Sequence, residues 1–348
     1  MARNLGSWPN LLPRLFHYCS DQKRRDLCRI SLKEYFCSFM TSKLALTRHI
    51  AELYARGENV MANLRSLSGS AGANSLNTVE DIMISYDFQA GSYIRSYEQD
   101  PAYLDRYTTE LRNVLGQLGP IDTLLEAGCG EATTLSILAS SMQARPALGG
   151  FDISWSRVKL GQAFAGSHKL SPTLFCADLF RIPLADHSVD VVYTSHSIEP
   201  NGGREREAIG ELARVARNWL VLLEPAHDLA GDEARRRMES HGYVQDLAAT
   251  IRTLGLTLVE HRLFPVCANP LNPTGLYLVK MGSTADRAKA FSFQCPVSGT
   301  PLEPGPDAWY APKSYLAYPV LRGVPCLLEN NAILATKFRA GDGSSLPA

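Results

Sequence analysis

The chain has 348 residues, enough to bury one sizeable core, and its length suggests one large domain with appendages or two domains. Its 35 Lys and Arg residues balance its 35 Asp and Glu residues, so no global charge attracts nucleic acid or an anionic membrane. Prolines and charges interrupt the apolar residues at the N-terminus, and no stretch approaches the ~20 apolar residues of a membrane span. We therefore expect a cytoplasmic protein that does not enter a membrane.

Eight cysteines are too few for a disulfide scaffold in a chain of this length. Three of them, Cys19, Cys28 and Cys37, recur every nine residues. Nine residues are two and a half helical turns, so neighbouring thiols would lie on opposite faces of a helix. We expect thiols, and no metal site at these three positions.

The N-terminal region is the basic part of the chain. Residues 1–49 hold nine Lys or Arg residues against three acidic ones, with apolar residues between them. This pattern predicts short amphipathic helices with a solvated basic face, and binding of an RNA or a phosphorylated partner is the alternative. Residues 66–78 are rich in Ser, Gly and Asn and are typical of a linker. The first expected unit is thus a helical extension with its linker, residues 1–80.

After the linker, strand and helix patterns alternate. Asp100 and Pro101 are typical of a helix start, and apolar residues at helical spacing continue to Gly119. Strands are expected at residues 122–128, 147–153, 173–178, 189–195, 219–225, 256–264 and 275–281. Further helices are expected at residues 132–143, 155–166, 204–217, 232–240 and 244–253. The alternation predicts an α/β fold with a doubly wound parallel sheet, and the last two strands predict an antiparallel edge pair.

The segment LLEAGCGEATT, residues 124–134, ends the first strand in a glycine turn that opens a helix. Such a turn brings backbone N–H groups and the positive end of the helix close to a ligand. An NAD fingerprint would add a third glycine, where Ala132 follows here, although Asp152 ends the second strand at a suitable spacing. The carboxylate of Glu126 would repel a pyrophosphate, but it suits the ammonium group of a bound amino acid.

Over roughly residues 84–281, these motifs resemble the class I S-adenosylmethionine-dependent methyltransferases, in particular those of methyltransferase type 11. LEAGCGEATT is similar to their first motif, GFDIS to the acid of the second strand, CADLFRIPLADHSVDVVYTSHSIEP to the third and fourth strand region, and WLVLLEP to the fifth strand. The resemblance implies a seven-stranded Rossmann-like sheet in residues 81–282 and S-adenosyl-L-methionine as cofactor.

The resemblance also implies roles for single residues. Glu126, Gly128 and Gly130 would lie along the methionine portion of the cofactor. Asp152 would accept hydrogen bonds from the ribose hydroxyls, and Asp178 from the adenine amino group. The other residues expected at the cofactor are Ile153, Leu179 and Ser195, with Tyr86 and Tyr93 from a lid segment.

The lid segment is ISYDFQAGSYI, residues 84–94, which precedes the helix expected from Pro101. It resembles the segment that many of these enzymes fold over the cofactor. Tyr86 and Tyr93 would then close the site, and an aromatic face near the sulfonium would gain cation–π attraction. Packing of the two tyrosines against the sheet is the alternative.

Methyl transfer from a sulfonium releases a neutral leaving group, so positioning supplies most of the catalysis. A base is needed only where the acceptor holds a proton. His196 is the expected general base, because its ordinary pKa is near neutral and it follows the fourth strand. Glu199 or Asn201 would orient it or the substrate, and a role of His196 in shaping the pocket alone is the alternative. Glu224 ends the fifth strand and is a further candidate to face the pocket, whereas His227 and His241 are weaker candidates that are expected at the surface.

Residues 291–340 form an expected small β-rich module. Roughly residues 293–338 resemble the small zinc-ribbon partner protein of some tRNA and protein methyltransferases, most closely in YPVLRGVPCLL. Ser298 follows Cys295 where a zinc-binding member would pair two cysteines, and Cys326 has no companion, so four tetrahedral ligands are not assembled. We expect a metal-free module that covers apolar surface of the catalytic domain.

The expected function is methyl transfer to oxygen or nitrogen of a small molecule or a saccharide unit. The basic N-terminus and the fused module favour the alternative of a tRNA or protein substrate. Two further hypotheses are an NAD-dependent oxidoreductase, which Glu126 disfavours, and a non-catalytic scaffold with a methyltransferase fold. A homo-oligomer is compatible with the sequence.

Overall fold

The computed structural model describes residues 46–67, 76–283 and 289–339. The chain divides into two compact units, residues 1–69 and 70–348. In the first unit, helices α3 (Thr47–Ala55) and α4 (Val60–Leu67) contact each other. Most of the basic segment, with Cys19, Cys28 and Cys37, lies outside the described residues. Among the helices that are described, none combines the length and apolar character that a membrane crossing requires.

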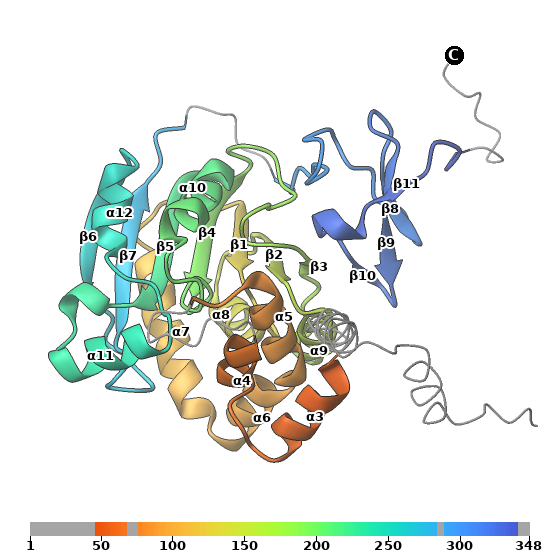
Figure 1. Ribbon diagram of the computed structural model, residues 1–348. Coiled ribbons are helices and arrows are strands. Elements are labelled where there is room, and N and C mark those ends of the chain that lie inside the picture. The colour runs from red at the N-terminus through yellow and green to blue at the C-terminus, as the bar shows by residue number, and fades with distance from the viewer. Residues whose placement is uncertain (1–45, 68–75, 284–288, 340–348) are drawn as a thin grey trace, which may run out of the picture. The chain divides into compact units, whose positions relative to one another are not determined.

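The second unit is built on a seven-stranded sheet with the order β3-β2-β1-β4-β5-β7-β6 (Figure 1). Its strands are β1 (Thr123–Ala127), β2 (Ala147–Asp152), β3 (Thr173–Cys176), β4 (Val189–Ser195), β5 (Ala216–Pro225), β6 (Thr257–Leu263) and β7 (Thr274–Lys280). Strands β1 to β5 pair in parallel, while β7 runs antiparallel to β5 and β6. The predicted doubly wound Rossmann-like fold with an antiparallel end is confirmed.

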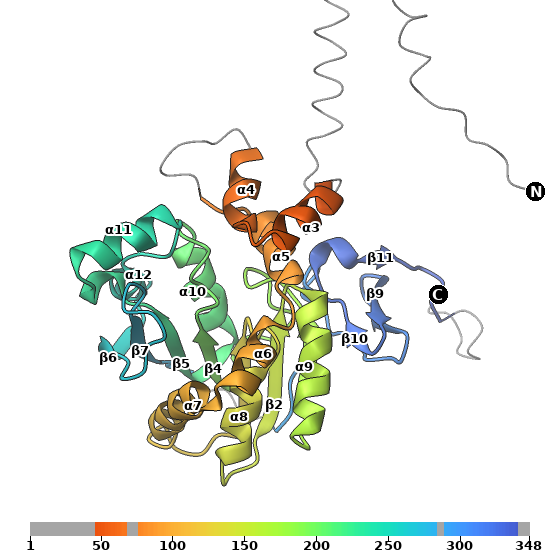
Figure 2. The same cartoon turned by 90° about the horizontal axis from the view of Figure 1, so that it is seen from below.

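Helices cover both faces of this sheet (Figure 2). They are α7 (Pro101–Leu115), α8 (Thr133–Ser141) and α9 (Trp155–Ser167) on one face, and α10 (Glu205–Val215) and α12 (Leu247–Thr253) on the other, with α11 (Asp232–Ser240) following β5. Successive strand residues alternate between two hydrophobic cores: Leu124 packs with α7, α8 and α9, and Leu125 with α10 and α12. This alternation is what a strand period of two dictates.

Two predicted boundaries are wrong, and each has a long-range cause. Strand β5 begins at Ala216, inside the predicted helix 204–217, because Arg217 reaches across to Asp190 on β4 and is buried there. Helix α12 begins at Leu247 instead of residue 244, because Val244 donates its backbone N–H to the carbonyl of Glu199.

The lid segment precedes α7, as predicted, and it lies in two helices that the sequence did not predict. They are α5 (Val79–Phe88) and α6 (Ser92–Gln99), and α5 also spans the predicted division between residues 80 and 81. Thr78 and Asp81 form a reciprocal capping box that starts α5. The stop of α5 at Gln89, followed by Gly91 with φ +91°, lets the chain turn into α6.

The C-terminal module is a small antiparallel sheet. Its strands are β8 (Ala308–Ala311), β9 (Leu316–Leu321), β10 (Val324–Pro325) and β11 (Ile333–Leu334). Leu327 donates its backbone N–H to the carbonyl of Cys176 at 2.8 Å, so the module pairs with edge strand β3. Covering this edge removes a surface on which another chain could add a strand.

The module also fills a gap in the helical layer. Residues 177–188, between β3 and β4, contain no helix, and the sheet face beneath them would lack apolar cover. Phe151 and Phe175 of that face share one hydrophobic core with Trp309 and Tyr318 of the module. The prediction that the module covers apolar surface is confirmed. No cluster of three or more His, Cys, Asp or Glu residues suited to a metal occurs in the described ranges.

Candidate active site

The glycine turn after β1 is shaped by two backbone requirements. Gly128 and Gly130 have φ of +69° and +53°, a region that side chains disfavour. A Cβ on Gly128 would also lie 2.2 Å from the Cβ of Ser197 in the loop after β4. The turn therefore needs glycine at residue 128 both for its conformation and for close approach of the two loops.

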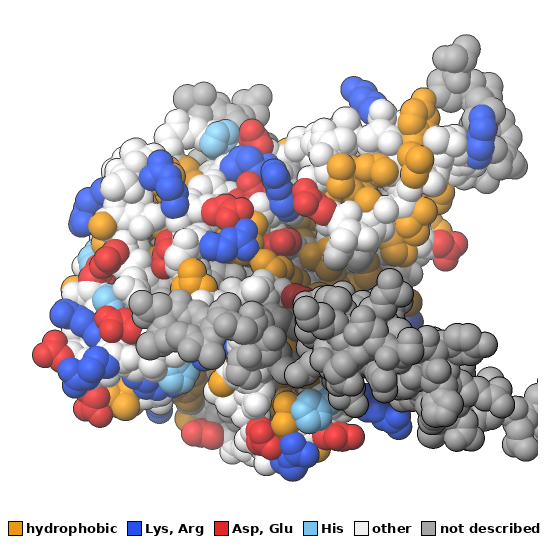
Figure 3. Space-filling model, in the orientation of Figure 1, with side chains coloured by type: hydrophobic (Ala, Val, Ile, Leu, Met, Phe, Trp, Pro, Cys, Tyr) orange, Lys and Arg blue, Asp and Glu red, His pale blue; other side chains and the backbone are white. Residues whose placement is uncertain are grey.

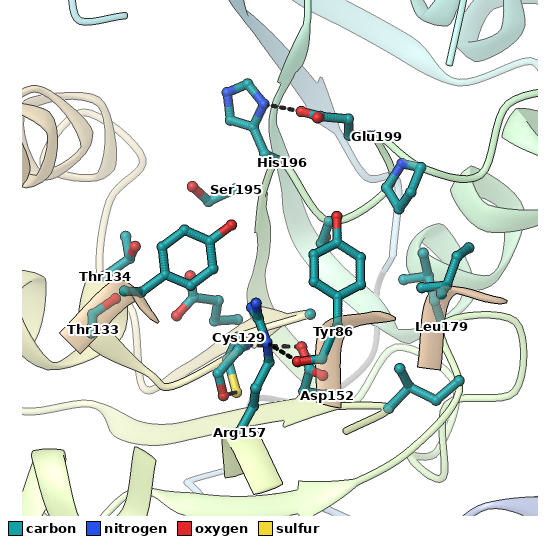
Figure 4. Close-up of a pocket in the computed structure, with 18 of the residues that line it drawn as sticks. Tyr86, Cys129, Thr133, Thr134, Asp152, Arg157, Leu179, Ser195, His196 and Glu199 are labelled. Atoms are coloured by element: carbon teal, nitrogen blue, oxygen red, sulfur yellow. Dashed lines mark hydrogen bonds and ion pairs between the residues drawn. The ribbon is translucent and has the colours of Figure 1, made fainter. Parts of the chain in front are cut away.

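One cavity of about 650 Å³ lies beside this turn (Figure 4). All thirteen residues that the sequence predicted for the site line it: Tyr86, Tyr93, Glu126, Gly128, Gly130, Asp152, Ile153, Asp178, Leu179, Ser195, His196, Glu199 and Asn201. They come from α5, α6 and the carboxyl ends of β1 to β4, which is where open α/β sheets bind ligands. The structure thus brings the predicted residues together, while their individual roles stay predictions.

The three acids at the ends of β1 to β3 are held by backbone amides. Glu126 accepts a hydrogen bond from the N–H of Leu135 in α8 at 3.1 Å. Asp152 accepts one from Gly130 at 3.0 Å and one from Ser154 at 2.9 Å. Each of these two carboxylates is therefore fixed in direction by backbone N–H groups of a neighbouring turn or helix.

Burial raises the pKa of all three acids. For Glu126 the value reaches about 8, because the side chain is 2 % exposed and the charged form is poorly solvated. Burial also raises the pKa of Asp152, although Arg157 opposes the shift, and that of Asp178, which accepts from the N–H of Phe180 at 3.0 Å. A positively charged ligand group beside them would reverse this effect, since it favours the ionised form.

The loop after β4 carries an acid–base pair. His196 Nδ1 lies 2.5 Å from Glu199 Oε2, and Nε2 lies 2.8 Å from Thr274 Oγ1 at the start of β7. Burial lowers the pKa of His196, but the neighbouring Glu199 and Glu224 outweigh it, so the pKa is raised overall. For Glu199 the effects have the opposite sign: burial raises the pKa, but the neighbouring His196 outweighs burial and the pKa is lowered overall. Each of the two residues thus stabilises the charged form of the other.

Glu224 and Asn201 serve this loop in a way that the sequence did not indicate. Glu224 does not line the cavity, although the sequence made it a candidate to face it. Its carboxylate instead accepts hydrogen bonds from the backbone N–H groups of residues 197, 198 and 199, and burial raises its pKa to about 7. The Asn201 amide nitrogen donates to the carbonyls of Ser197 and Ile198. Both side chains hold the loop that presents His196, whose φ of +54° requires such support.

Several residues of the site escaped sequence reasoning because they arrive from distant segments. Tyr107 of α7 shares a 2.9 Å hydrogen bond with Ser195, and Asn272 donates to Glu199 at 3.1 Å. Arg157 of α9 lies over the rings of Tyr86 and Tyr93. No local sequence pattern marks Tyr107 or Asn272. For Arg157 the only available signal is that it lies in the first turn of the helix that follows the predicted Asp152. His227 and His241, the weaker histidine candidates, do not line the cavity, and both are half-buried instead of lying at the surface.

A family model described as a methyltransferase domain matches residues 124–218. That range contains the glycine turn, Asp152, Asp178 and the His196 loop. No curated protein matches the chain.

Solved structures resemble part of this chain at low identity. A magnesium protoporphyrin IX methyltransferase from Synechocystis with bound S-adenosylhomocysteine is 18% identical, with a TM-score of 0.45, covering 57% of this chain and 99% of that one. For geranyl diphosphate C-methyltransferase from Streptomyces coelicolor the identity is 12% and the TM-score 0.41, over 50% and 75% of the two chains. The [4+2]-cyclase SpnF, 16% identical with a TM-score of 0.41, covers 51% of this chain and 81% of its own. These neighbours assign no substrate to this chain, and the similarity to a methyltransferase domain model is confined to residues 124–218.

Proposed function

We propose that this chain is an S-adenosylmethionine-dependent methyltransferase that methylates a hydroxyl or amino group of a small molecule or a saccharide unit. One observation carries the proposal: the strand-end acids and the His196–Glu199 pair line the same cavity, within the family match. Its volume of about 650 Å³ is typical of sites for small ligands.

The cavity suits a nucleoside that carries an amino acid. Asp152 and Asp178 each have carboxylate oxygens that accept a single backbone hydrogen bond and keep a lone pair for ligand hydroxyl or amino groups. Glu126 supplies negative charge for an ammonium group, and its raised pKa returns toward the ordinary value when that group is present. When bound, S-adenosylmethionine supplies an activated methyl group on a sulfonium, and the chain's own work is to position the acceptor against it.

In this proposal, His196 takes a proton from the acceptor. Glu199 holds the Nδ1 side of the ring, which leaves Nε2 for proton exchange. The Thr274 hydroxyl now at Nε2 marks the direction from which an acceptor hydroxyl or amine would approach. The proton would move to Nε2, and Glu199 would stabilise the imidazolium that forms.

Charge favours a small acceptor over a nucleic acid. Arg157 is the one Lys or Arg among the described residues that line the cavity, whereas five acidic side chains line it: Asp100, Glu126, Asp152, Asp178 and Glu199. Phosphate groups would meet repulsion there. On the face shown in Figure 3, Lys and Arg side chains are interspersed with Asp and Glu and form no single basic field. The alternatives are methyl transfer to tRNA or protein and a scaffold without activity. The acceptor test below distinguishes both from the proposal.

The first test is calorimetric binding of S-adenosylhomocysteine to the wild type and to Asp152→Asn. We expect the wild type to bind and the variant to lose about 10- to 100-fold in affinity, because a hydrogen bond to a charged group is worth about 1.5–3 kcal/mol. Asp105→Asn, which changes an exposed carboxylate outside the cavity, is the matched control and should bind like the wild type. A wild type that does not bind would remove the proposal.

The second test identifies the acceptor. Labelled methyl groups are transferred from S-adenosylmethionine into lysate fractions treated separately with glycosidase, ribonuclease or protease. Labelling that survives ribonuclease and protease supports the proposal, and loss with glycosidase narrows it to a saccharide unit. Loss with ribonuclease or protease would establish the macromolecular alternative, and cofactor binding without labelling in any fraction would favour the scaffold.

A further inference from the structure

Arg157 stands out among the residues that line the cavity. It is the third residue of α9, and only 3 % of its surface is exposed. Its Nε donates to the backbone carbonyl of Tyr86 at 2.9 Å. The guanidinium carbon lies 4.7 Å from the ring centroid of Tyr86 and 4.8 Å from that of Tyr93. A buried cation is thus fixed in orientation by one hydrogen bond and two aromatic rings.

Part of this guanidinium lacks a partner. The terminal nitrogen NH2 is buried without a hydrogen bond to any described residue. The other terminal nitrogen, NH1, lies only 3.2 Å from where a Cβ on Gly130 would be, so the group faces the glycine turn. Leaving a charged donor buried and unsatisfied costs about 1–3 kcal/mol or more. Such a group at a binding cavity is best explained by a ligand that completes it.

The neighbouring acidic side chains do not supply the missing hydrogen-bond partner of the Arg157 guanidinium. Glu131 accepts from the backbone N–H groups of Gly91 and Ile94 in the lid region. Asp87 accepts from Ser154 and Ser156 at the start of α9. The oxygens of Asp152 face the backbone of Gly130 and Ser154, as described above. The negative charges around Arg157 are therefore directed to other donors, which leaves the guanidinium available to an anion from outside the chain.

We propose that Arg157 binds the carboxylate of an amino-acid-bearing ligand in this cavity. The inference rests on the proposed function, under which that ligand is S-adenosylmethionine and the carboxylate belongs to its methionine portion beside Gly130. A guanidinium matches a carboxylate by two parallel N–H···O bonds, which fix geometry as well as charge. Arg157 and Glu126 would then recognise the two ends of a zwitterion, the carboxylate and the ammonium group.

This assignment makes Arg157 a specificity residue. The discriminating pair of ligands is S-adenosylhomocysteine and 5′-methylthioadenosine, which share the nucleoside and the sulfur but differ in the amino-acid group. In Arg157→Gln the side chain keeps a donor for the Tyr86 carbonyl and loses the charge. We expect its affinity for S-adenosylhomocysteine to fall about 10- to 100-fold, while affinity for 5′-methylthioadenosine changes by less than about 3-fold.

Calorimetry on the folded full-length chain measures both ligands, and thermal melting checks the fold of each variant. Arg157→Lys keeps the charge but lacks the paired N–H donors of a guanidinium. Its loss of affinity should therefore be smaller than that of Arg157→Gln and again confined to S-adenosylhomocysteine. Arg252→Met changes an exposed arginine outside the cavity and is the matched control. Equal weakening of both ligands in Arg157→Gln and Arg157→Lys would assign Arg157 to the fold and overturn the inference, as would no change in either.

The two proposals fail in different ways. If the wild type binds neither ligand, the proposed function itself is removed. If the wild type binds S-adenosylhomocysteine and Arg157→Gln binds it equally well, only the role of Arg157 is removed. Should Arg157→Gln not fold, the ratio of the two affinities in Arg157→Lys decides the question.

Discussion

Strand β4 carries a buried acid–base pair near each end, and the two pairs differ in how completely they are satisfied. At its start, Asp190 accepts from Arg217, from Asn218 and from the backbone of residues 122 and 123. The side chains of Asp190 and Arg217 are 0 % and 1 % exposed, and neither lines the cavity. Past its end, His196 pairs with Glu199, but 26 % of the His196 side chain is exposed, and it lines the cavity.

This difference separates a structural pair from a functional one. Every contact of Asp190 joins β4 to β1 or β5, so the pair can contribute only to the fold. His196 keeps one ring nitrogen on a hydroxyl that a ligand can replace, and its backbone is held in a left-handed conformation by the loop around it. Substitutions at the first pair should change stability, and substitutions at the second should change turnover.

The largest effect on the fold is expected for Asp190→Ala. Removing the carboxylate breaks a fully buried ion pair with Arg217, and breaking such a pair destabilises a protein by about 3–5 kcal/mol. Urea unfolding of the variant measures this loss of stability. Adding Arg217→Met to Asp190→Ala should restore part of the lost stability, because the buried charge is then removed as well. A loss below about 1 kcal/mol in Asp190→Ala would contradict the contrast between the pairs.

The largest effect on turnover is expected for His196→Asn. Asparagine tolerates the left-handed backbone at this position but cannot act as the base, so kcat should fall about 10²- to 10⁴-fold. Affinity for S-adenosylhomocysteine and stability to urea should stay close to those of the wild type. His241→Asn, outside the cavity, is the control. Unchanged kcat in His196→Asn would leave His196 with a role in the shape of the pocket alone.

A smaller, diagnostic effect is expected in the pH profile of Glu199→Gln. Glu199 raises the pKa of His196, and a base is lost as the pH falls through its pKa, so the acidic limb of kcat/KM belongs to this pair. Without the carboxylate the pKa of His196 drops. The acidic limb should therefore move to lower pH, with a reduced maximum. A limb that stays in place would show that another group sets it.

The smallest effect is expected for Asn201→Ala. Its amide donates two hydrogen bonds to the loop backbone, at 3.3 Å and 3.2 Å, so stability should fall by about 1 kcal/mol and kcat by less than about 5-fold. Urea unfolding and steady-state kinetics measure the two quantities. A drop in kcat as large as that of His196→Asn would instead assign Asn201 to the substrate, as the sequence predicted.

The half of the site at β1 to β3 was predictable because its interactions are local or follow from strand order. Glu126, Asp152 and Asp178 each end a strand, and each binds the backbone of the turn beside its own strand end or the neighbouring one. Parallel strands bring their carboxyl ends to one edge, so recognising the parallel doubly wound sheet was sufficient to gather the three acids. The seven strands and the parallel arrangement followed from hydrophobic patterning and from the motifs.

The half at β4 was predictable only in part. His196 and Glu199 are three residues apart, and their pairing could be expected. Thr274 and Asn272 lie more than 70 residues further along the chain, and nothing near them signals a contact with the histidine loop. The lid helices were missed for a related reason. Their start depends on the capping box of Thr78, at the end of a Ser- and Gly-rich stretch that favours a linker.

The sequence by itself determined the succession of strands along the chain, the glycine turn and the acids near the ends of three strands, because these depend on local backbone preference and on hydrophobic period. Only the tertiary structure decided which of those acids meet backbone amides, which distant residues support His196, and that Arg157 faces the turn with an unsatisfied nitrogen. It also assigned Glu224 to the loop instead of the cavity. These facts depend on where separate segments pack, and the free energy of that packing is shared among residues too far apart in the chain for a local pattern to record.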